Sequence, residues 1–261
     1  MKIQVLIATM KQKDHNLLKK MNISTDAIVG NQCDYNSIEN FTYNGNNIVY
    51  LNFKEKGVGL NRNNCLMRAT GDICLFADDD MIYVDDYSKI VESAFSENPT
   101  ADVIIFNLSE KEKKRYIIKK KEKINRFNYL RYGTARIAIK LNSIKSNAIY
   151  FNQCFGGGTE HCHGEDNLFL TSCLKNGLKI IAVPRTIANL TEERESTWNN
   201  ENIMKYLKDQ GILYKTISKR FYLLLCLQDS IRRRKYYKMP FYKAFKIMVS
   251  KNGENLYEKN N

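Results

Sequence analysis

Short apolar segments alternate with amphipathic segments along the first two thirds of the chain. The apolar segments are rich in Ile, Val and Leu, which is typical of strands that are buried on both faces of a sheet. This alternation predicts an α/β fold in which helices flank a mixed, mostly parallel sheet. The predicted strands are residues 2–9, 26–31, 47–53, 72–77, 102–108, 135–141 and 178–183.

Between the strands, apolar residues recur with the spacing of helices that pack on a sheet. Residues 58–69 place their apolar side chains on one face, and residues 87–95 follow an i, i+3, i+4, i+7, i+8 repeat. A third helix is predicted over residues 165–176. It should end at Gly177, because glycine readily adopts the left-handed conformation that terminates helices.

After Pro184 the pattern changes, and residues 201–250 show helical spacing among many Lys, Arg and Tyr side chains. We therefore expect an α/β domain over residues 1–200 and a helical, basic C-terminal extension over residues 201–261. The hydrophobic content of 43% in 261 residues is enough for a substantial core.

The positive charge of the chain is concentrated in two segments. The formal net charge is +13, and residues 111–123 carry eight basic and two acidic side chains. Residues 215–251 carry eleven basic side chains and one acidic side chain. The rest of the chain is therefore slightly acidic. The positive charge is a property of two local segments and not of the fold as a whole.

The cysteines and the apolar runs bear on where the protein acts. Seven cysteines without paired spacing favour reduced thiols over a disulfide framework. The N-terminal segment has neither a basic leader nor a cleavage site, so no signal peptide is expected. The longest later apolar run, residues 221–227, is much shorter than the roughly 20 residues that a spanning helix needs. We expect a cytoplasmic protein that does not cross a membrane.

Three consecutive carboxylates, Asp78, Asp79 and Asp80, follow the predicted strand 72–77. Ligands of such sheets bind beyond the carboxyl ends of the strands. Crowded carboxylates raise one another's pKa unless a cation compensates them, and hard oxygen ligands suit Mg²⁺ or Mn²⁺. The cluster predicts a divalent metal site, although a solvated turn that caps the next helix explains these three residues equally well when they are taken alone.

A second acidic motif lies far along the chain, within residues 155–170. The glycines at 156–158 and Gly164 allow the backbone to approach a ligand closely, and Glu165 and Asp166 stand at the start of a predicted helix. Helix capping alone would explain the two acidic residues. Their occurrence together with the aspartate cluster and the glycines favours a catalytic site.

The ordered combination of these motifs resembles the family-two glycosyltransferases of the GT-A fold, of the bacterial type that builds polysaccharides. The resemblance spans residues 2–200. GVGLNRNNCLMRATGDICLFADDD, residues 57–80, stands in place of the family's ARN and DxDD pattern, and GEDNLF, residues 164–169, stands in place of its late ED motif. The resemblance implies a Rossmann-like sheet and an inverting transfer of a hexose or N-acetylhexosamine from a nucleotide sugar, with UDP as the expected nucleotide.

The resemblance also implies roles for residues on the donor side. Asp78 and Asp80 would hold the Mg²⁺ or Mn²⁺ ion that bridges the donor diphosphate, and Asp79 would lie close to the ribose. Thr9, at the end of the first strand, occupies the position of a nucleobase contact. Arg62 matches the arginine of the ARN segment, where a positive side chain and a helix N-terminus would face the nucleotide anion.

On the acceptor side, the resemblance implies that Asp166 is the general base that removes the proton of the attacking hydroxyl. Glu165 is the alternative, either as the base or as a contact for an acceptor hydroxyl. A helix N-terminus lowers the pKa of a carboxylate, whereas neighbouring carboxylates raise it. The sequence leaves this balance open.

The chain departs from the family pattern in two places. Where the family has a pair of aspartates after the second strand, this chain has Asn31 and Gln32, either of which could hydrogen-bond the nucleobase through its amide. A late histidine that often binds the metal is missing from residues 185–197. Asn189 or water would complete the metal coordination instead.

The histidines of the EHCHGED segment and the basic segments allow further interpretations. Zinc binding at residues 161–163 is disfavoured because adjacent side chains rarely point at one centre. Residues 215–251 could lie on an anionic membrane surface, which would suit a lipid-linked or glycan acceptor, or they could pack on the domain or mediate dimerisation. We expect no nucleic-acid partner. The rival functions are a nucleotidyltransferase of related fold and a non-catalytic basic protein that binds membranes or nucleic acid.

Overall fold

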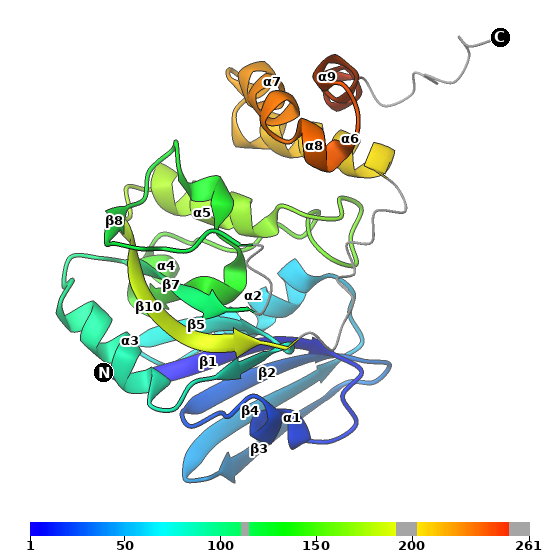
Figure 1. Ribbon diagram of the computed structural model, residues 1–261. Coiled ribbons are helices and arrows are strands. Elements are labelled where there is room, and N and C mark those ends of the chain that lie inside the picture. Colours follow the sequence, from blue (N-terminus) through cyan, green and yellow to red (C-terminus); the bar gives the residue numbers. More distant parts are fainter. Residues whose placement is uncertain (111–114, 192–202, 251–261) are drawn as a thin grey trace.

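A mixed ten-stranded sheet forms the centre of the computed structural model, which describes residues 1–110, 115–191 and 203–250 (Figure 1). The strand order is β3-β4-β2-β1-β5-β9-β7-β10-β6, and β8 pairs with β10. The strands are β1 (Ile3–Met10), β2 (Asp26–Gln32), β3 (Ser37–Tyr43), β4 (Asn46–Phe53), β5 (Ile73–Asp78), β6 (Met81–Tyr83), β7 (Val103–Ser109), β8 (Glu122–Lys123), β9 (Ile137–Lys140) and β10 (Ile180–Leu190).

The central part of this sheet is parallel, as the sequence predicts. β4, β2, β1 and β5 pair in parallel, and β7 pairs in parallel with β10. β9 lies antiparallel between β5 and β7. The parallel strands therefore bring their carboxyl ends to one edge, where Thr9 of β1 stands opposite Asn31 of β2, and Ala8 stands opposite Asp78 of β5.

Alternate residues of the strands point to opposite faces of the sheet and build two cores. Val5 and Ile7 of β1 belong to one core, together with Tyr87 and Val91 of α3 (Tyr87–Ser96). Leu6 belongs to the other core. Helix α1 (Asn16–Lys20) also packs on the first core. The helices that pack on the second core are α2 (Val58–Arg68), α4 (Leu141–Ser146) and α5 (Glu165–Lys175).

The C-terminal helices form a layer beside α5, at the end of the molecule away from β3 (Figure 1). They are α6 (Ile203–Ile217), α7 (Tyr222–Arg232), α8 (Arg234–Tyr237) and α9 (Phe241–Val249). Their own apolar core includes Leu213, Cys226 and Ile247, and it reaches Phe155 and Leu168 of the α/β part. The helical extension is therefore present and packs on the α/β part, and the predicted boundary at residue 200 lies outside the described residues.

The structure differs from the predicted elements in a few places. β10 does not end at residue 183 but continues through Pro184 to Leu190. The register of β10 against β7 shifts between Ala182 and Thr186, and such an irregularity accommodates a proline that has no N–H to donate. The strands β3, β6 and β8 were not predicted, and of these β6 and β8 have only three and two residues. In β3 the burial alternates only between half-buried and exposed, so its apolar signal is weak.

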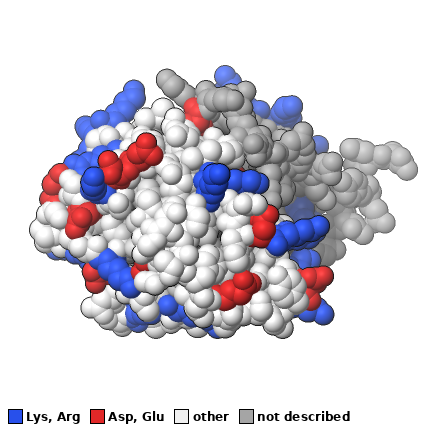
Figure 2. Space-filling view, turned by 90° about the horizontal axis from the view of Figure 1, so that it is seen from below, with Lys and Arg blue, Asp and Glu red and all other residues white. Residues whose placement is uncertain are grey.

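The face of the α/β part that lies away from the C-terminal helices carries mixed charge (Figure 2). Figure 2 looks at the end of the molecule away from the C-terminal helices and shows Lys and Arg interspersed with Asp and Glu, with wide uncharged areas between them. Within the described ranges, no helix combines the length and the apolar character needed to cross a membrane. All seven cysteines are free thiols.

Candidate active site

The aspartate cluster lies at the carboxyl end of β5, beside the end of β1. Thr9 donates a hydrogen bond through Oγ1 to Oδ2 of Asp79 at 2.5 Å. Thr9 is buried and also accepts a hydrogen bond from Nε2 of Gln12 at 2.9 Å. Two of the residues assigned to the nucleotide, Thr9 and Asp79, are therefore in direct contact, and Gln12 is a neighbour that the sequence did not single out.

Asn31 has a different environment from the one expected for an open nucleobase contact. It is fully buried, its Nδ2 donates to Gln12 O and to Oδ1 of Asn52, and its Oδ1 accepts from Gln12 N at 3.0 Å. The amide thus fixes the backbone after β1. The alternative residue, Gln32, accepts a hydrogen bond from the backbone N–H of Gly57 through Oε1 at 2.9 Å. Asn31 and Gln32 thus both hold backbone segments. Gln12 and Gln32 are half-buried, whereas Asn31 is fully buried.

Arg62 connects the two acidic motifs. It is about 5% exposed, and its guanidinium binds Oδ1 of Asp78 through Nη2 at 2.6 Å and Oε1 of Glu165 through Nη1 at 2.8 Å. Asp78 and Glu165 are 87 positions apart in the sequence, yet both contact one planar group. The aspartate cluster and the late acidic motif therefore converge on one place, as the predicted site requires.

The surroundings of Arg62 hold its charge in the interior. Burial alone would lower the pKa of Arg62, but the charges of Asp78 and Glu165 outweigh burial and raise this pKa above its ordinary value. The guanidinium also lies over the ring of Phe151, 5.5 Å from the ring centre. Its Nε is buried without a hydrogen-bond partner among the described residues. Phe151 is thus a further neighbour of the site that the motifs did not reveal.

Glu165 and Asp166 begin α5 and differ in their partners. Glu165 is buried and bound to Arg62. Asp166 is half-buried, and its pKa is raised to about 7 by burial and by the charge of Glu165, against the opposing effects of the Asn167 N–H and Arg62. The balance that the sequence left open therefore favours a carboxyl that can exchange a proton near neutral pH, which is what a general base needs.

Gly164 allows this helix start to lie against the C-terminal helices. Its φ is +106°, and a Cβ at this position would lie 2.6 Å from Cδ2 of Leu213 in α6. Both the backbone conformation and the close approach require glycine. The glycine before the ED pair therefore sets the position of α5 relative to α6.

Asp80 extends the carboxylate cluster toward β10. Its pKa is raised, first by burial and then by the charges of Asp78 and Asp79. Its backbone carbonyl accepts hydrogen bonds from the N–H and the hydroxyl of Thr191, at 2.7 and 3.0 Å. Uncompensated negative charge of this kind is relieved when a cation binds.

The carboxylates of the aspartate cluster could bind a divalent cation that a substrate diphosphate also contacts. Nowhere in the described ranges do three or more His, Cys, Asp or Glu side chains form a group that could hold a metal. Mg²⁺, however, is usually held by one or two carboxylates together with substrate phosphates and water, which Asp78 and Asp80 could provide. Asn189 is exposed and pairs with Ile82 across the antiparallel β10·β6 ladder. Residues 192–197 of the segment without a histidine lie outside the described residues.

A cavity of about 290 Å³ opens beside Asp166. Its lining includes residues 130–133 around Gly133, residues 163–167 at the start of α5, and side chains from the C-terminal helices. The sequence analysis did not predict that the C-terminal helices line a cavity. The only signal for it in the sequence was the high content of Tyr and Arg in the extension. The lining residues that the C-terminal helices provide are Tyr206, Gln210, Tyr214, Arg233 and Tyr236.

The HCH segment before Gly164 connects the site to α6. Nδ1 of His161 lies 3.2 Å from Oδ1 of Asp209, and Nε2 of His163 lies 2.8 Å from Oε1 of Gln210. The pKa of Cys162 is raised to about 11 by burial and by Asp209, so its thiol stays protonated. These contacts connect the segment to α6.

Comparison with known proteins agrees with this geometry. The sequence profile described as glycosyl transferase family 2 matches residues 24–155, which is half of the chain. Among curated protein sequences, none matches significantly.

Solved structures of TarS from S. aureus share the fold. TarS 1-349 in complex with UDP-GlcNAc is 17% identical, with a TM-score of 0.65 over 96% of this chain and 76% of that chain. The structure described as S. aureus TarS is 14% identical, with a TM-score of 0.62 over 95% of this chain and 55% of that chain. TarS 1-349 with UDP is 18% identical, with a TM-score of 0.57 over 95% and 81% of the two chains. At these identities the likeness establishes a GT-A-like fold.

Proposed function

Because the chain belongs to glycosyl transferase family 2 and is an enzyme of that family, we propose that it moves a hexose or N-acetylhexosamine from a nucleotide sugar to a glycan or lipid-linked acceptor, with inversion at the anomeric carbon. The observation that carries this proposal is the double ion pair of Arg62, which joins Asp78 to Glu165. This double ion pair supports a single site, in which the aspartates that hold the donor and the general base act on the same sugar.

The donor lies over the carboxyl ends of β1, β2 and β5. Thr9 and Gln12 face the nucleobase, Asn31 holds the loop that carries Gln12, and Asp79 lies near the ribose. The donor is UDP-linked. Support comes from the related fold of TarS, which was solved with UDP-GlcNAc and with UDP.

Asp78 and Asp80 would hold a Mg²⁺ or Mn²⁺ ion at the donor diphosphate. When bound, such an ion stabilises the negative charge that develops on the departing diphosphate. Arg62 lies against Asp78, so it keeps that carboxylate in place and adds positive charge beside the diphosphate.

Asp166 acts as the general base. It accepts the proton of the acceptor hydroxyl while the hydroxyl oxygen attacks the anomeric carbon, and the bond from that carbon to the diphosphate breaks on the opposite face. The raised pKa of Asp166, about 7, supports this role because an effective base has a pKa near the working pH. Glu165 is the positioning residue, since its ion pair with Arg62 fixes the first turn of α5.

The acceptor enters through the cavity beside Asp166. Its Tyr206 and Tyr236 side chains offer faces on which a sugar ring can pack, and Gln210 offers an amide for hydroxyl groups. The C-terminal extension is therefore part of the acceptor site. We place the enzyme in the cytoplasm, where its free thiols would remain reduced.

The rival functions account for less of the structure. A nucleotidyltransferase would need a basic glycine-rich loop after the first strand, whereas β1 is followed by Lys11 and Gln12, and Gln12 binds Asn31. A protein that only binds membranes or nucleic acid would have no use for a carboxyl with a pKa near 7 beside a buried ion pair. Family membership likewise favours glycosyl transfer.

The proposal is tested with the purified chain, Mn²⁺ and a panel of nucleotide sugars, by measuring nucleoside diphosphate release. We expect release from a UDP-sugar, which EDTA abolishes. Asp80→Ala should lose metal-dependent donor binding in calorimetry. The matched control is Asp86→Asn, because Asp86 is an exposed carboxylate with φ +55°, which asparagine tolerates. A panel that gives no release and no donor binding, or an Asp80→Ala variant that binds donor like the parent, contradicts the proposal.

A further inference from the structure

The outer side of α7 carries an apolar ridge of large side chains that are about half exposed. Leu223, Leu227 and Ile231 are spaced by four residues and lie on one helix face, where 48%, 37% and 50% of each residue is exposed. Leu224, beside them, is 63% exposed. The opposite side, with Cys226, is buried in the core of the C-terminal helices. α7 therefore presents apolar side chains both to the protein and to its surroundings.

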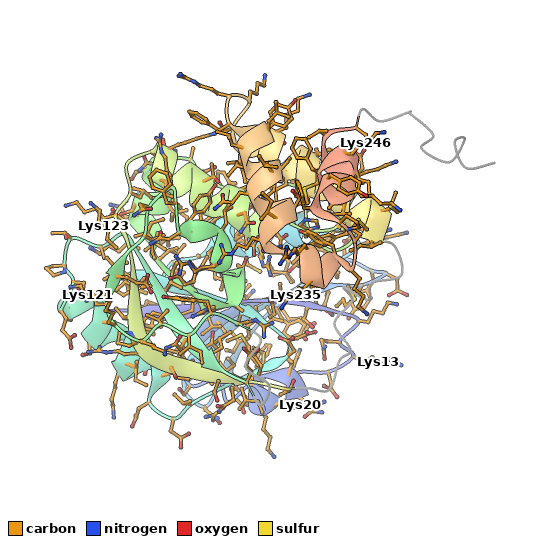
Figure 3. The ribbon with its side chains drawn as sticks, turned by 45° about the horizontal axis from the view of Figure 1, so that its top comes forward. Lys13, Lys20, Lys121, Lys123, Lys235 and Lys246 are labelled. Carbon is orange, nitrogen blue, oxygen red and sulfur yellow. The ribbon has the colours of Figure 1, made fainter. Side chains whose placement is uncertain are left out.

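Basic side chains surround this ridge without an exposed acidic partner in the same stretch. All ten Lys and Arg residues of residues 215–250 are exposed. The one acidic residue of that range, Asp229, is buried, and its carboxylate is bound to Arg233 and Tyr237. The other basic segment lies elsewhere, since Figure 3 shows Lys235 on the C-terminal helices and Lys121 at the far side of the α/β part. The charge around α7 is thus a local, one-sided surface.

Two kinds of occupant could cover an exposed apolar ridge. A second copy of the chain, docked through the same ridge, would bring two sets of uncompensated positive charge together, which is unfavourable because like charges repel. An anionic lipid surface offers acyl chains to the leucines and negative headgroups to the surrounding Lys and Arg. The described helices are not suited to crossing a bilayer, so such contact is restricted to its surface.

We propose that α7, with the basic residues at its two ends, docks the enzyme on an anionic membrane surface and lies in the plane of the interface. Arg220 precedes the ridge, and Arg232 and Lys235 follow it, so both ends of the helix reach the headgroups. Phe241 at the start of α9 is 44% exposed and adds an aromatic side chain to the same helical layer.

The docking surface and the cavity beside Asp166 share a helical layer. Tyr236 is 53% exposed and also lines that cavity, as does Arg233. A docked enzyme would keep the cavity close to the bilayer, where a lipid-linked acceptor carries its hydroxyl. This consequence for the acceptor rests on the proposed function, whereas the docking itself does not.

The experiment is flotation of the full chain with vesicles of phosphatidylcholine alone and with an equimolar mixture of phosphatidylcholine and phosphatidylglycerol, without donor or metal. We expect binding to the mixed vesicles that weakens as salt is added, and little binding to phosphatidylcholine. Each Lys or Arg near an anionic surface contributes about a fivefold gain in partitioning. Arg232→Gln, Arg234→Gln and Lys235→Gln together should therefore lower partitioning by roughly a hundredfold.

The apolar ridge is tested with Leu223→Ser, Leu224→Ser and Leu227→Ser combined, which should lower partitioning by at least tenfold, since each leucine loses apolar contact with the lipid. The matched control is Ile38→Ser, because Ile38 is 52% exposed on the edge strand β3. For the charge variant, the control combines Lys13→Gln, Lys20→Gln and Lys121→Gln, whose lysines lie away from α7 (Figure 3). Circular dichroism checks that all variants are folded.

The outcomes separate the occupants. Loss of flotation in the charge and leucine variants, with both controls floating like the parent, supports the proposal. Equal binding to both vesicle types, or flotation that the controls lose to the same extent, overturns it. A chain that ignores both vesicles and sediments as a dimer, which the leucine substitutions dissociate, also overturns it and identifies a second copy as the occupant.

Discussion

The raised pKa of Asp166 predicts that Asp166→Asn stabilises the fold and that the gain depends on pH. Burial and the Glu165 charge raise the pKa of Asp166 to about 7, whereas an aspartate in an unfolded chain titrates near about 3.9. The native state therefore binds this proton more tightly than the unfolded state does. The contribution of Asp166 to stability falls as the pH rises between the two values, and the neutral asparagine lacks this loss.

The size of the effect follows from the two pKa values. Their separation of roughly 3 units corresponds to about 4 kcal/mol at high pH, at about 1.4 kcal/mol per unit. About 2–3 kcal/mol of this loss falls between pH 5 and pH 8. Asp166 is only half-buried, and solvent near the carboxylate reduces the cost of its charge, so we expect about 2 kcal/mol in this interval.

The assay is urea unfolding followed by circular dichroism at pH 5 and pH 8, without donor or metal. The stability advantage of Asp166→Asn over the parent should grow by about 2 kcal/mol between these pH values. Asp209→Asn is the matched control. Burial would raise the pKa of Asp209, but hydrogen bonds from Lys205 and Cys162 outweigh burial and lower it, so this variant should lose stability at both pH values. An Asp166→Asn advantage that is equal at pH 5 and pH 8 refutes the reasoning.

Two further substitutions test the construction of the site. Arg62→Lys keeps the charge but lacks the planar group that binds two carboxylates at once. We therefore expect a loss of turnover of roughly a hundredfold. A variant that retains the parent's turnover contradicts the bridging role of Arg62. Gly164→Ala forces a side chain into φ +106° and against Leu213, which should lower stability by about 1–3 kcal/mol in thermal unfolding. Gly157→Ala is its control, because an added Cβ there meets nothing within 4 Å, and equal effects of the two alanines would exclude the proposed contact.

Much of the fold could be predicted because the central strands are buried on both faces. β1, β2, β4, β5, β7 and β9 all carry continuous apolar runs, and such runs stand out in a single sequence. β3 lies at the edge and alternates weakly, so local composition does not reveal it. The course of β10 through Pro184 depends on a register shift against β7, which only the tertiary structure provides.

The carboxylate side of the site could be predicted better from the sequence than the cavity beside Asp166. The carboxylates and Arg62 belong to local motifs with fixed order, so their convergence could be expected. Gln12 became visible only through its hydrogen bonds to Thr9 and Asn31. Three of the four tyrosines of the cavity, Tyr206, Tyr214 and Tyr236, come from helices that follow residue 200, and no spacing rule relates those helices to the acidic motif. Their role depends on the packing of α6 against Gly164, which is a property of the folded chain.

The central claim is that Asp166 removes the acceptor proton from a sugar donor held by the aspartate cluster. It is tested most directly by measuring, for Asp166→Asn, both the donor dissociation constant and the rate of nucleoside diphosphate release at saturating donor and metal. We predict a dissociation constant within about twofold of the parent's and a rate lowered by roughly a hundredfold or more. A variant that binds donor equally well and releases nucleoside diphosphate at the parent's rate would contradict the claim.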